Sequence, residues 1–264
     1  LNNQNESNDE EEEEEEANET DSDEENEISI DLDKNRILSD SFNYQDLTNL
    51  IFIAMQENDI QAQLILGNIY YKGELIKRDI KQAIFYYSLA AEQNDSKAQI
   101  KLGRLYSDKS NSEFDIEKAI HYFTLAADQN NIKAQLILGQ IYTTNLYIRP
   151  DVEKGIHYYS LAASQNDRNA LIALGHLYYE NEFVPHDINK SIHYYKLAAD
   201  QNDMIAQYRL GIIYGNNKYV ARDLHKSIYY FTLAADQNNV NSQYYLGLIY
   251  YDENNPNFYD VNKG

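Results

Sequence analysis

The sequence predicts an all-α solenoid built from tandem helix-pair repeats, preceded by an acidic arm. A leucine, a glycine directly after it and a tyrosine three positions further on recur together every 36 residues. The glycines of this pattern are Gly67, Gly103, Gly139, Gly175, Gly211 and Gly247. One fixed period of this length is typical of units that cannot bury their own apolar faces and therefore stack on their neighbours.

The composition fits a long helical core and excludes several classes of site. Of the 264 residues, 43% are hydrophobic, and Gly and Pro are scarce while Tyr is abundant. The chain has no Cys, which excludes disulfides, thiolate metal sites and cysteine nucleophiles. No apolar run approaches the length of a membrane span, so we expect no direct membrane insertion and a cytoplasmic location. Because the chain begins at Leu1 instead of Met, we expect the natural N-terminus to lie upstream, and secretory targeting stays open.

Residues 1–39 are predicted to form a disordered acidic arm. Residues 1–33 contain 17 Asp and Glu and no Lys or Arg, so they carry most of the net charge of −21. They also lack the apolar area that would offset the loss of chain entropy on folding. Nonspecific nucleic-acid binding depends on cations that displace counterions from phosphates, so the acidic chain argues against a nucleic-acid partner.

Residues 40–264 are predicted to form the repeat solenoid. Residues 43–59 align with a segment 36 residues later, which indicates a degenerate half repeat at the start of the array. Full repeats begin at residues 62, 98, 134, 170 and 206, and a truncated repeat begins at residue 242. Residues 260–264 match the start of another helix, so we expect the natural chain to continue beyond them.

Each repeat is predicted to contain two helices. In the first block Ala62, Leu66 and Tyr70 recur at helical spacing, and the second block shows a similar pattern. An Asp stands where each second helix begins, and its side chain can accept the unpaired amide hydrogens there; these residues are Asp79, Asp115, Asp151, Asp187 and Asp223. Each second helix is followed by an Asn, which tolerates the left-handed conformation that ends a helix; these residues are Asn94, Asn130, Asn166, Asn202 and Asn238.

These motifs resemble the Sel-1-like repeat, a longer relative of the tetratricopeptide repeat. One copy consists of Ala98, Leu102, Gly103 and Tyr106, followed by Asp115, Lys118, Ala119, Ile120, Tyr122, Leu125, Ala126 and Ala127. The resemblance covers about residues 43–264, although Asn replaces the glycine that usually follows the alanine pair and the second loop glycine is missing. It implies a right-handed α-α superhelix and an adaptor role, as members have in endoplasmic-reticulum-associated degradation, signalling and bacterial secretion.

The first helices are predicted to present a groove to a peptide or protein partner. At 100° per residue, three columns lie opposite the face that holds Ala62, Leu66 and Tyr70. They are Leu64, Ile100, Leu136, Ile172, Tyr208 and Tyr244; Asn68, Arg104, Gln140, His176, Ile212 and Leu248; and Tyr71, Ser107, Thr143, Tyr179, Gly215 and Tyr251. An apolar strip beside variable polar positions suits peptide recognition, with Tyr208 and Tyr244 as anchors. Periodicity leaves open whether the first column lines the groove or packs between repeats.

Basic residues gather in the second and third full repeats. They are Lys97, Lys101, Arg104 and Lys133, of which Lys97, Arg104 and Lys133 fall on the predicted groove face. Such a group can receive an acidic peptide or a C-terminal carboxylate, and Arg can do so with two parallel hydrogen bonds. The acidic arm is one such ligand, which gives the hypothesis of an intramolecular contact that competes with partners.

The sequence shows no motif for catalysis, a cofactor or a metal. His121, His157 and His193 share one column of the second helices, but neighbouring helices lie about 8 to 10 Å apart while zinc bonds are about 2 Å long, which favours solvated or packing histidines. No phosphate-binding loop, nucleophile elbow or spaced carboxylate pair stands out. The sequence therefore predicts a noncatalytic interaction scaffold. The alternative is the regulatory repeat region of a larger protein, either a kinase fusion or an adaptor of an endoplasmic-reticulum ubiquitin ligase.

Overall fold

The computed structural model describes residues 44–144, 146–180, 184–218 and 220–251. The predicted acidic arm at 1–39 and the motif at 260–264 lie outside these residues. Throughout the described part of the chain, helices form the regular structure and strands are absent. The predicted class, an all-α solenoid of helix-pair repeats, is confirmed.

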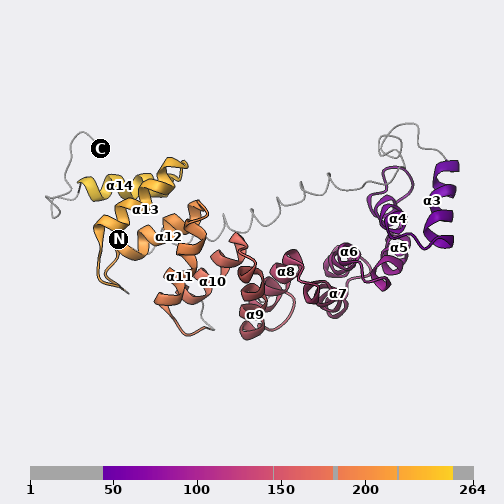
Figure 1. Cartoon of the computed structure of the whole chain (residues 1–264), viewed down its shortest axis with the longest axis horizontal. Helices are drawn as coiled ribbons and strands as arrows, with labels where there is room; N and C mark the ends of the chain where they lie inside the picture. The colour runs from indigo at the N-terminus through magenta and orange to yellow at the C-terminus, as the bar shows by residue number, and fades with distance from the viewer. Residues whose placement is uncertain (1–43, 145, 181–183, 219, 252–264) are drawn as a thin grey trace. The chain divides into compact units, whose positions relative to one another are not determined.

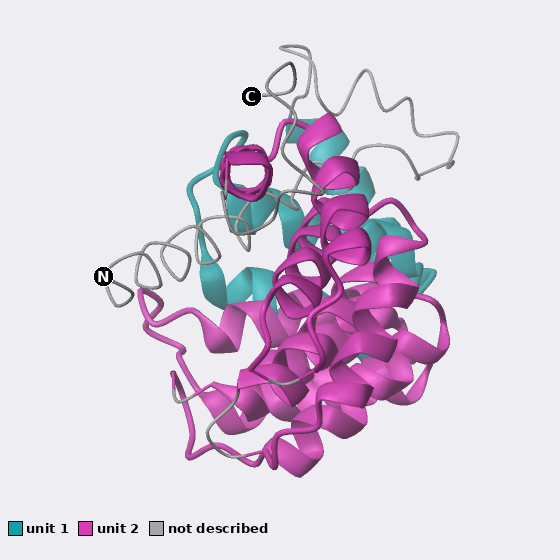
Figure 2. Ribbon diagram, turned by 90° about the vertical axis from the view of Figure 1, so that its left-hand side faces the viewer, with its two compact units in different colours: residues 1–93 teal, residues 94–264 magenta. Residues whose placement is uncertain are grey.

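The chain divides into two compact units, Leu1–Gln93 and Asn94–Gly264 (Figure 2). The described helices of the first unit are α3 (Tyr44–Gln56), α4 (Ile60–Lys72) and α5 (Ile80–Glu92). Those of the second unit are α6 (Ser96–Ser107), α7 (Ile116–Asp128), α8 (Ile132–Thr143), α9 (Val152–Ser164), α10 (Arg168–Glu180), α11 (Ile188–Ala199), α12 (Met204–Gly215), α13 (Leu224–Asp236) and α14 (Val240–Tyr251). Even numbers mark the first helix of a repeat and odd numbers the second. In the second unit, α6 and α8 lie along one side and α7 and α9 along the other (Figure 1).

The second helices begin and end as the sequence predicts. The Asp115 carboxylate accepts a hydrogen bond from the Lys118 amide at 3.0 Å, and the other four predicted Asp caps accept equivalent bonds. The predicted Asn residues after these helices all have a left-handed backbone, with φ between 60° and 70°. Both observations follow from the need to satisfy the unpaired amide and carbonyl groups at helix ends.

The first helices carry caps that the sequence analysis missed. An Asp or Asn three positions before the first small residue of each repeat accepts a hydrogen bond from the amide of that residue, as Asp59 does from Ala62 at 2.7 Å. The equivalent caps are Asp95, Asn131, Asp167, Asp203 and Asn239. The helices therefore start about two residues before the predicted repeat boundaries. The signal was the column of Asp and Asn itself, which has the same 36-residue period.

The glycine column lets the two helices of a repeat approach closely. An added Cβ at Gly103 would lie 2.5 Å from the ring of Phe123 on α7, and the equivalent atom at Gly139 would lie 2.6 Å from the ring of Tyr159 on α9. Both rings are buried. Any larger side chain at these glycines would therefore displace an aromatic ring from the core.

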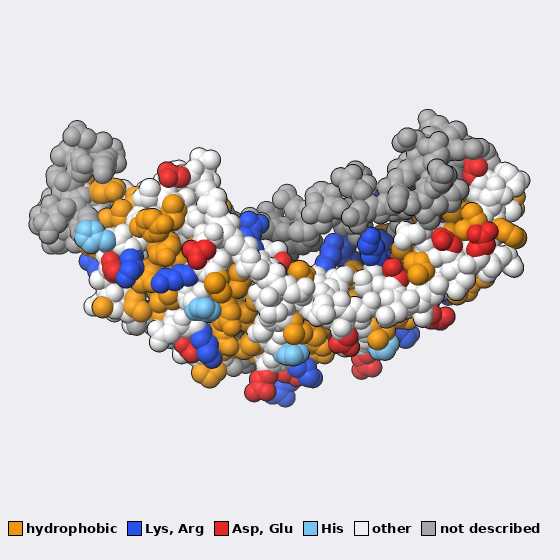
Figure 3. Space-filling model, in the orientation of Figure 1, with side chains coloured by type: hydrophobic (Ala, Val, Ile, Leu, Met, Phe, Trp, Pro, Cys, Tyr) orange, Lys and Arg blue, Asp and Glu red, His pale blue; other side chains and the backbone are white. Residues whose placement is uncertain are grey.

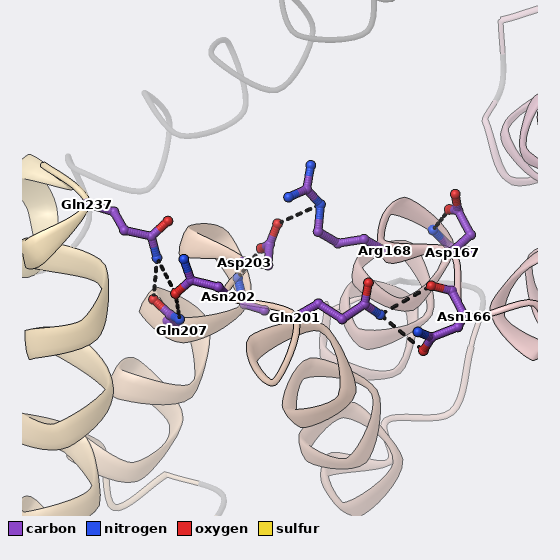
Figure 4. Close-up of polar contacts among 10 residues, drawn as sticks. Asn166, Asp167, Arg168, Gln201, Asn202, Asp203, Gln207 and Gln237 are labelled. Carbon is purple, nitrogen blue, oxygen red and sulfur yellow. Dashed lines mark hydrogen bonds and ion pairs between the residues drawn. The ribbon is translucent and has the colours of Figure 1, made fainter.

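In four of the five full repeats a partly buried amide contact joins the start of the first helix to the end of the second helix. The Gln129 side chain donates to Gln99 at 2.7 Å, and the same pairing recurs between Gln165 and Gln135, between Gln237 and Gln207, and in the first unit between Gln93 and Gln63. The repeat at 168–203 differs, because Leu171 occupies the position of the first Gln. There Gln201 donates to Asn166 instead, and Arg168 pairs with Asp203 at 3.4 Å (Figure 4).

Candidate protein-binding face

The first predicted groove column lies mostly in the core. Leu64, Ile100 and Tyr208 are only 4%, 7% and 8% exposed. The half-buried side chains of Leu136 and Ile172 pack against the core clusters of the second unit. These five positions therefore correspond to packing between helices and not to an accessible groove. Tyr244 on α14 is the exception, with 58% of its surface exposed.

Helix packing on two sides explains the buried column. Each first helix in the interior of the second unit contacts its own second helix and also the second helix of the preceding repeat, as α12 contacts α13 and α11. The Tyr208 ring on α12 lies 6.1 Å from the Phe231 ring on α13 and 6.2 Å from the Tyr245 ring on α14. A helix that is covered on two sides exposes less of its surface than a helical projection with one buried and one open face suggests.

The second and third predicted columns are partly or fully accessible, except for Tyr179, which is buried. In the second unit Gln140 is exposed, while Arg104 and His176 are half-buried. In the first unit, Asn68 accepts a hydrogen bond from the Tyr87 hydroxyl at 2.7 Å. Tyr71 is 40% exposed, and the Arg78 guanidinium lies 5.5 Å from its ring centroid. The accessible face of the first helices is thus polar on α6, α8 and α10, whereas on α14 it exposes Tyr244 and Leu248.

Positive charge is concentrated on this face in α6 and α8. Lys97, Lys101 and Arg104 are spaced by four and three residues, so they form one stripe along α6. Lys133 on α8 occupies the position of Lys97 one repeat later. Figure 3 shows Lys and Arg side chains gathered over this region. Lys97 is exposed, and the other three side chains are half-buried. We call these four residues the basic stripe.

Acidic side chains are absent from the two helices that carry the basic stripe. Neither α6 nor α8 contains an Asp or Glu, whereas α7 contains Glu117 and Asp128. Two acids adjoin α6: Asp95 precedes it and accepts a hydrogen bond from the Ala98 amide at 2.7 Å, and Asp108 follows it. The residues of α6 and α8 themselves carry only positive formal charges, although the whole chain is acidic.

Lysines of the second helices have a different role, because they are tied to capping carboxylates and aromatic rings. Lys118 pairs with Asp115 at 3.2 Å, and its amino group lies 5.2 Å from the Tyr106 ring centroid. Hydrogen bonds from Lys118, first through its amide and then through its side chain, hold the pKa of Asp115 below its usual value, and that carboxylate in turn raises the pKa of Lys118. These lysines stabilise helix starts and do not extend the basic stripe.

The three histidines in one column lie on the second helices. His121, His157 and His193 are exposed, and each ring lies edge-on to the tyrosine that follows it, with 5.3 Å between the ring centroids. These ring contacts agree with the expectation of solvated or packing histidines in this column.

Among the residues that the structure describes, no helix has the length and apolar character needed to cross a lipid bilayer.

Helix pairs stacked in tandem, with a polar face left open on the first helices, define a helical repeat scaffold. The model of the Sel1 repeat matches residues 60–95, 96–131, 132–167, 168–203 and 205–239. This chain belongs to the Sel1 repeat family. Proteins of this family are generally protein–protein interaction scaffolds and are generally noncatalytic.

Two solved structures resemble the chain over most of its length. One is c5321, a protective antigen of uropathogenic Escherichia coli strains with an SLR fold, at 27% identity and a TM-score of 0.67; the match covers 79% of this chain and 45% of that one. The other is a Sel1 repeat protein from Oxalobacter formigenes, at 28% identity and a TM-score of 0.59, with 84% and 95% covered. This chain thus spans less than half the length of the first relative. A comparison with curated proteins gives no match.

Proposed function

We propose that this chain is a noncatalytic scaffold that binds an acidic protein segment on the first-helix face of α6 and α8. The observation that carries the proposal is the basic stripe of Lys97, Lys101, Arg104 and Lys133 on two helices that contain no acidic residue. Solenoids present such faces as extended binding surfaces. Lys and Arg that line a surface attract carboxylates, and Arg can hold one with two parallel hydrogen bonds.

The spacing of the four basic residues supports a peptide ligand over a small anion. Three of the cations lie along α6 between residues 97 and 104, and the fourth lies on α8, so the positive surface is elongated. An extended acidic segment can contact several of these cations at once, whereas an isolated anion contacts one or two. Because most of these charges are partly solvated, each contact is worth about 0.2 to 1 kcal/mol, and affinity comes from their number.

A pair of charge-neutralising substitutions tests the proposal. The double variant Lys97→Gln/Arg104→Gln should bind a synthetic acidic peptide about 2- to 30-fold more weakly than the unmodified chain, because two contacts of this size are lost. Isothermal titration calorimetry measures the dissociation constant. Affinity of the unmodified chain should also fall as salt rises from 50 to about 200 mM, since these charges are screened.

The matched control is Lys77→Gln/Arg149→Gln. It removes one Lys and one Arg, as the test variant does, from exposed loop positions that do not belong to α6 or α8. Equal weakening in both double variants would mean that only net charge matters, and the basic stripe would not be the site. Circular dichroism at 222 nm verifies that each variant keeps its helices.

The acidic arm at 1–39 is a candidate for the same surface. Its 17 Asp and Glu in residues 1–33 complement the basic stripe in charge. We infer that the arm competes with external acidic ligands. Replacing the seven consecutive glutamates at 10–16 with Gln should then strengthen binding of an external acidic peptide in the same titration. Unchanged affinity would refute the competition and leave the basic stripe as a site for partners alone.

A further inference from the structure

A cavity of about 440 Å³ opens on the first-helix face of the repeat at 205–239. It lies among α12, α13 and α14, and its apolar lining includes Ile212, Phe231, Tyr245 and Leu248. The exposed side chain of Arg222 stands at its edge. The volume is within the range of about 300 to 1,000 Å³ that is common for ligand sites.

In the first and fourth full repeats a tyrosine stands at the position of Gly215, whereas the second and third repeats have Ser107 and Thr143 there. In the first full repeat Tyr71 lies in the last turn of α4, and the Arg78 guanidinium lies 5.5 Å from its ring centroid. In the fourth, the buried ring of Tyr179 lies 6.3 Å from the ring of His186. The residue seven positions before the basic or imidazole side chain is thus a tyrosine in both repeats.

The fifth repeat keeps the cation and lacks the ring. Gly215 and Arg222 occupy the positions that Tyr71 and Arg78 have in the first repeat. Gly215 lines the cavity, so the absence of a side chain at this position adds to the open space. The Arg222 side chain has no ring of this chain at position 215 on which to stack.

Packing beneath this position does not require the glycine. Ser227 donates a hydrogen bond to the Gly211 carbonyl at 2.8 Å, and Ser191 in the fourth repeat donates to the Gly175 carbonyl at the same distance. The fourth repeat accommodates Tyr179 above that serine. The same local framework can therefore hold a tyrosine ring.

The charge around the cavity favours an anionic group beside the ring. Among its lining residues Arg222 is the one with a formal charge, and no Asp or Glu lines it. Within the described part of the chain Arg222 makes no ion pair. A guanidinium in this position can stack on an aromatic ring and bind a neighbouring carboxylate.

We propose that this cavity binds a tyrosine or phenylalanine side chain of a partner protein, with an acidic residue next to it in the partner's sequence. The guest ring would lie next to Gly215, at the position where the first and fourth repeats carry Tyr71 and Tyr179, and its neighbouring carboxylate would pair with Arg222. The inference rests on the proposed function, since it assumes that the chain binds protein segments, and it names an aromatic anchor for them.

Short blocked peptides test the cavity on the full chain. We expect a Gly-Tyr-Asp-Gly peptide to bind in the millimolar range, as one anchor side chain allows, and a Gly-Ala-Asp-Gly peptide to bind at least about tenfold more weakly. Gly215→Tyr should abolish binding of the tyrosine peptide because the new ring fills the cavity. Arg222→Gln should weaken it about two- to fivefold and should have no effect on a Gly-Tyr-Asn-Gly peptide. Ligand-observed NMR measures these affinities.

Gly215→Ala is the matched control. Its Cβ would meet the Ser227 hydroxyl oxygen at 2.8 Å, as the Cβ of tyrosine would, but it leaves the cavity largely open. The alanine variant should keep at least half of the affinity. Equal loss in both variants would overturn the proposal, because the effect would then come from displacement of Ser227. Unchanged binding in a folded Gly215→Tyr variant would overturn it as well.

A second titration separates this inference from the proposed function. An acidic peptide without aromatic residues should bind Gly215→Tyr as it binds the unmodified chain, because the basic stripe is on α6 and α8. If that peptide binds and the tyrosine peptide does not, the cavity proposal fails alone. If the tyrosine peptide binds and Lys97→Gln/Arg104→Gln does not weaken the acidic peptide, the basic stripe fails alone.

Discussion

At the scale of single residues, a ring opposite each glycine determines how closely two helices approach. The aromatic position is Tyr in the first, third and fourth full repeats and Phe in the second and fifth; these residues are Tyr87, Phe123, Tyr159, Tyr195 and Phe231. The aromatic ring alone fills the space opposite the glycine. Where the residue is a tyrosine, its hydroxyl group has different hydrogen-bond partners in different repeats. Tyr87 donates to Asn68, whereas the hydroxyl of Tyr159 hydrogen-bonds with Thr143.

Burial of Tyr159 predicts a loss of stability at high pH. Desolvation raises the pKa of Tyr159 to about 12 from its usual 10. A group with a raised pKa in the folded state contributes fully below its unfolded pKa, and that contribution is lost as pH rises through the folded pKa. The unfolding free energy should therefore fall by about 1.4 kcal/mol per pH unit between about 10 and 12 through this residue.

Tyr159→Phe removes this part of the pH dependence. The variant should differ little in stability at pH 7, because Phe123 and Phe231 occupy the same position in other repeats. Urea unfolding at pH 7 and pH 11 measures the difference. If the variant and the unmodified chain lose equal stability between these pH values, Tyr159 does not ionise on unfolding as described.

At the scale of secondary-structure elements, caps define the helices more sharply than apolar periodicity does. The Asp residues before the second helices and the Asn residues after them were predicted from their fixed spacing. The caps of the first helices, such as Asp59 and Asp95, were not predicted. The apolar pattern alone puts the start of each full repeat at an alanine, three residues after the cap. Periodicity locates the buried face of a helix, whereas the end of a helix depends on single polar side chains.

Asp203 is a cap with a second function. Its carboxylate accepts a hydrogen bond from the Ala206 amide at 2.8 Å and pairs with Arg168 at 3.4 Å (Figure 4). Because Asp203 is buried, Asp203→Ala should lower the unfolding free energy by about 1 to 3 kcal/mol. Arg168→Gln should cost less than about 1 kcal/mol, since the guanidinium is half exposed.

Chemical denaturation of both variants provides the measurement. Asp95→Ala is the matched control, because Asp95 caps α6 without an arginine partner of this kind in its own repeat. A larger cost at Asp203 than at Asp95 measures what Arg168 adds. If Asp203→Ala costs less than Arg168→Gln, the cap is not the main contribution of this carboxylate.

At the scale of the whole molecule, the repeat period gave the fold class, but it could not identify the accessible face. A projection of one isolated helix left open whether Leu64, Ile100 and Tyr208 line a groove or pack between repeats. All three are buried, and Tyr208 packs against Phe231 of its own second helix and Tyr245 on the first helix of the next repeat. Contacts between repeats are not encoded in the periodicity of one helix, so they could not be read from it.

The basic stripe and the cavity at Gly215 differ in how far the sequence indicated them. Lys97, Arg104 and Lys133 were recognised because they cluster in neighbouring repeats on the predicted groove face. Gly215 was also in a predicted column, yet nothing in its own repeat indicated a cavity. The role that we propose for this position rests on comparison with Tyr71 and Tyr179 and on the contacts of Arg78 and His186.

The most direct test of the scaffold proposal is to locate a bound acidic segment on the chain. An acidic peptide that carries a photoreactive group is cross-linked to the full chain, and the attached residues are identified by mass spectrometry. The account predicts cross-links in Ser96–Ser107 and Ile132–Thr143, the two helices of the basic stripe, and their loss in Lys97→Gln/Arg104→Gln. Cross-links concentrated in α7 and α9, or unchanged in the double variant, would contradict it.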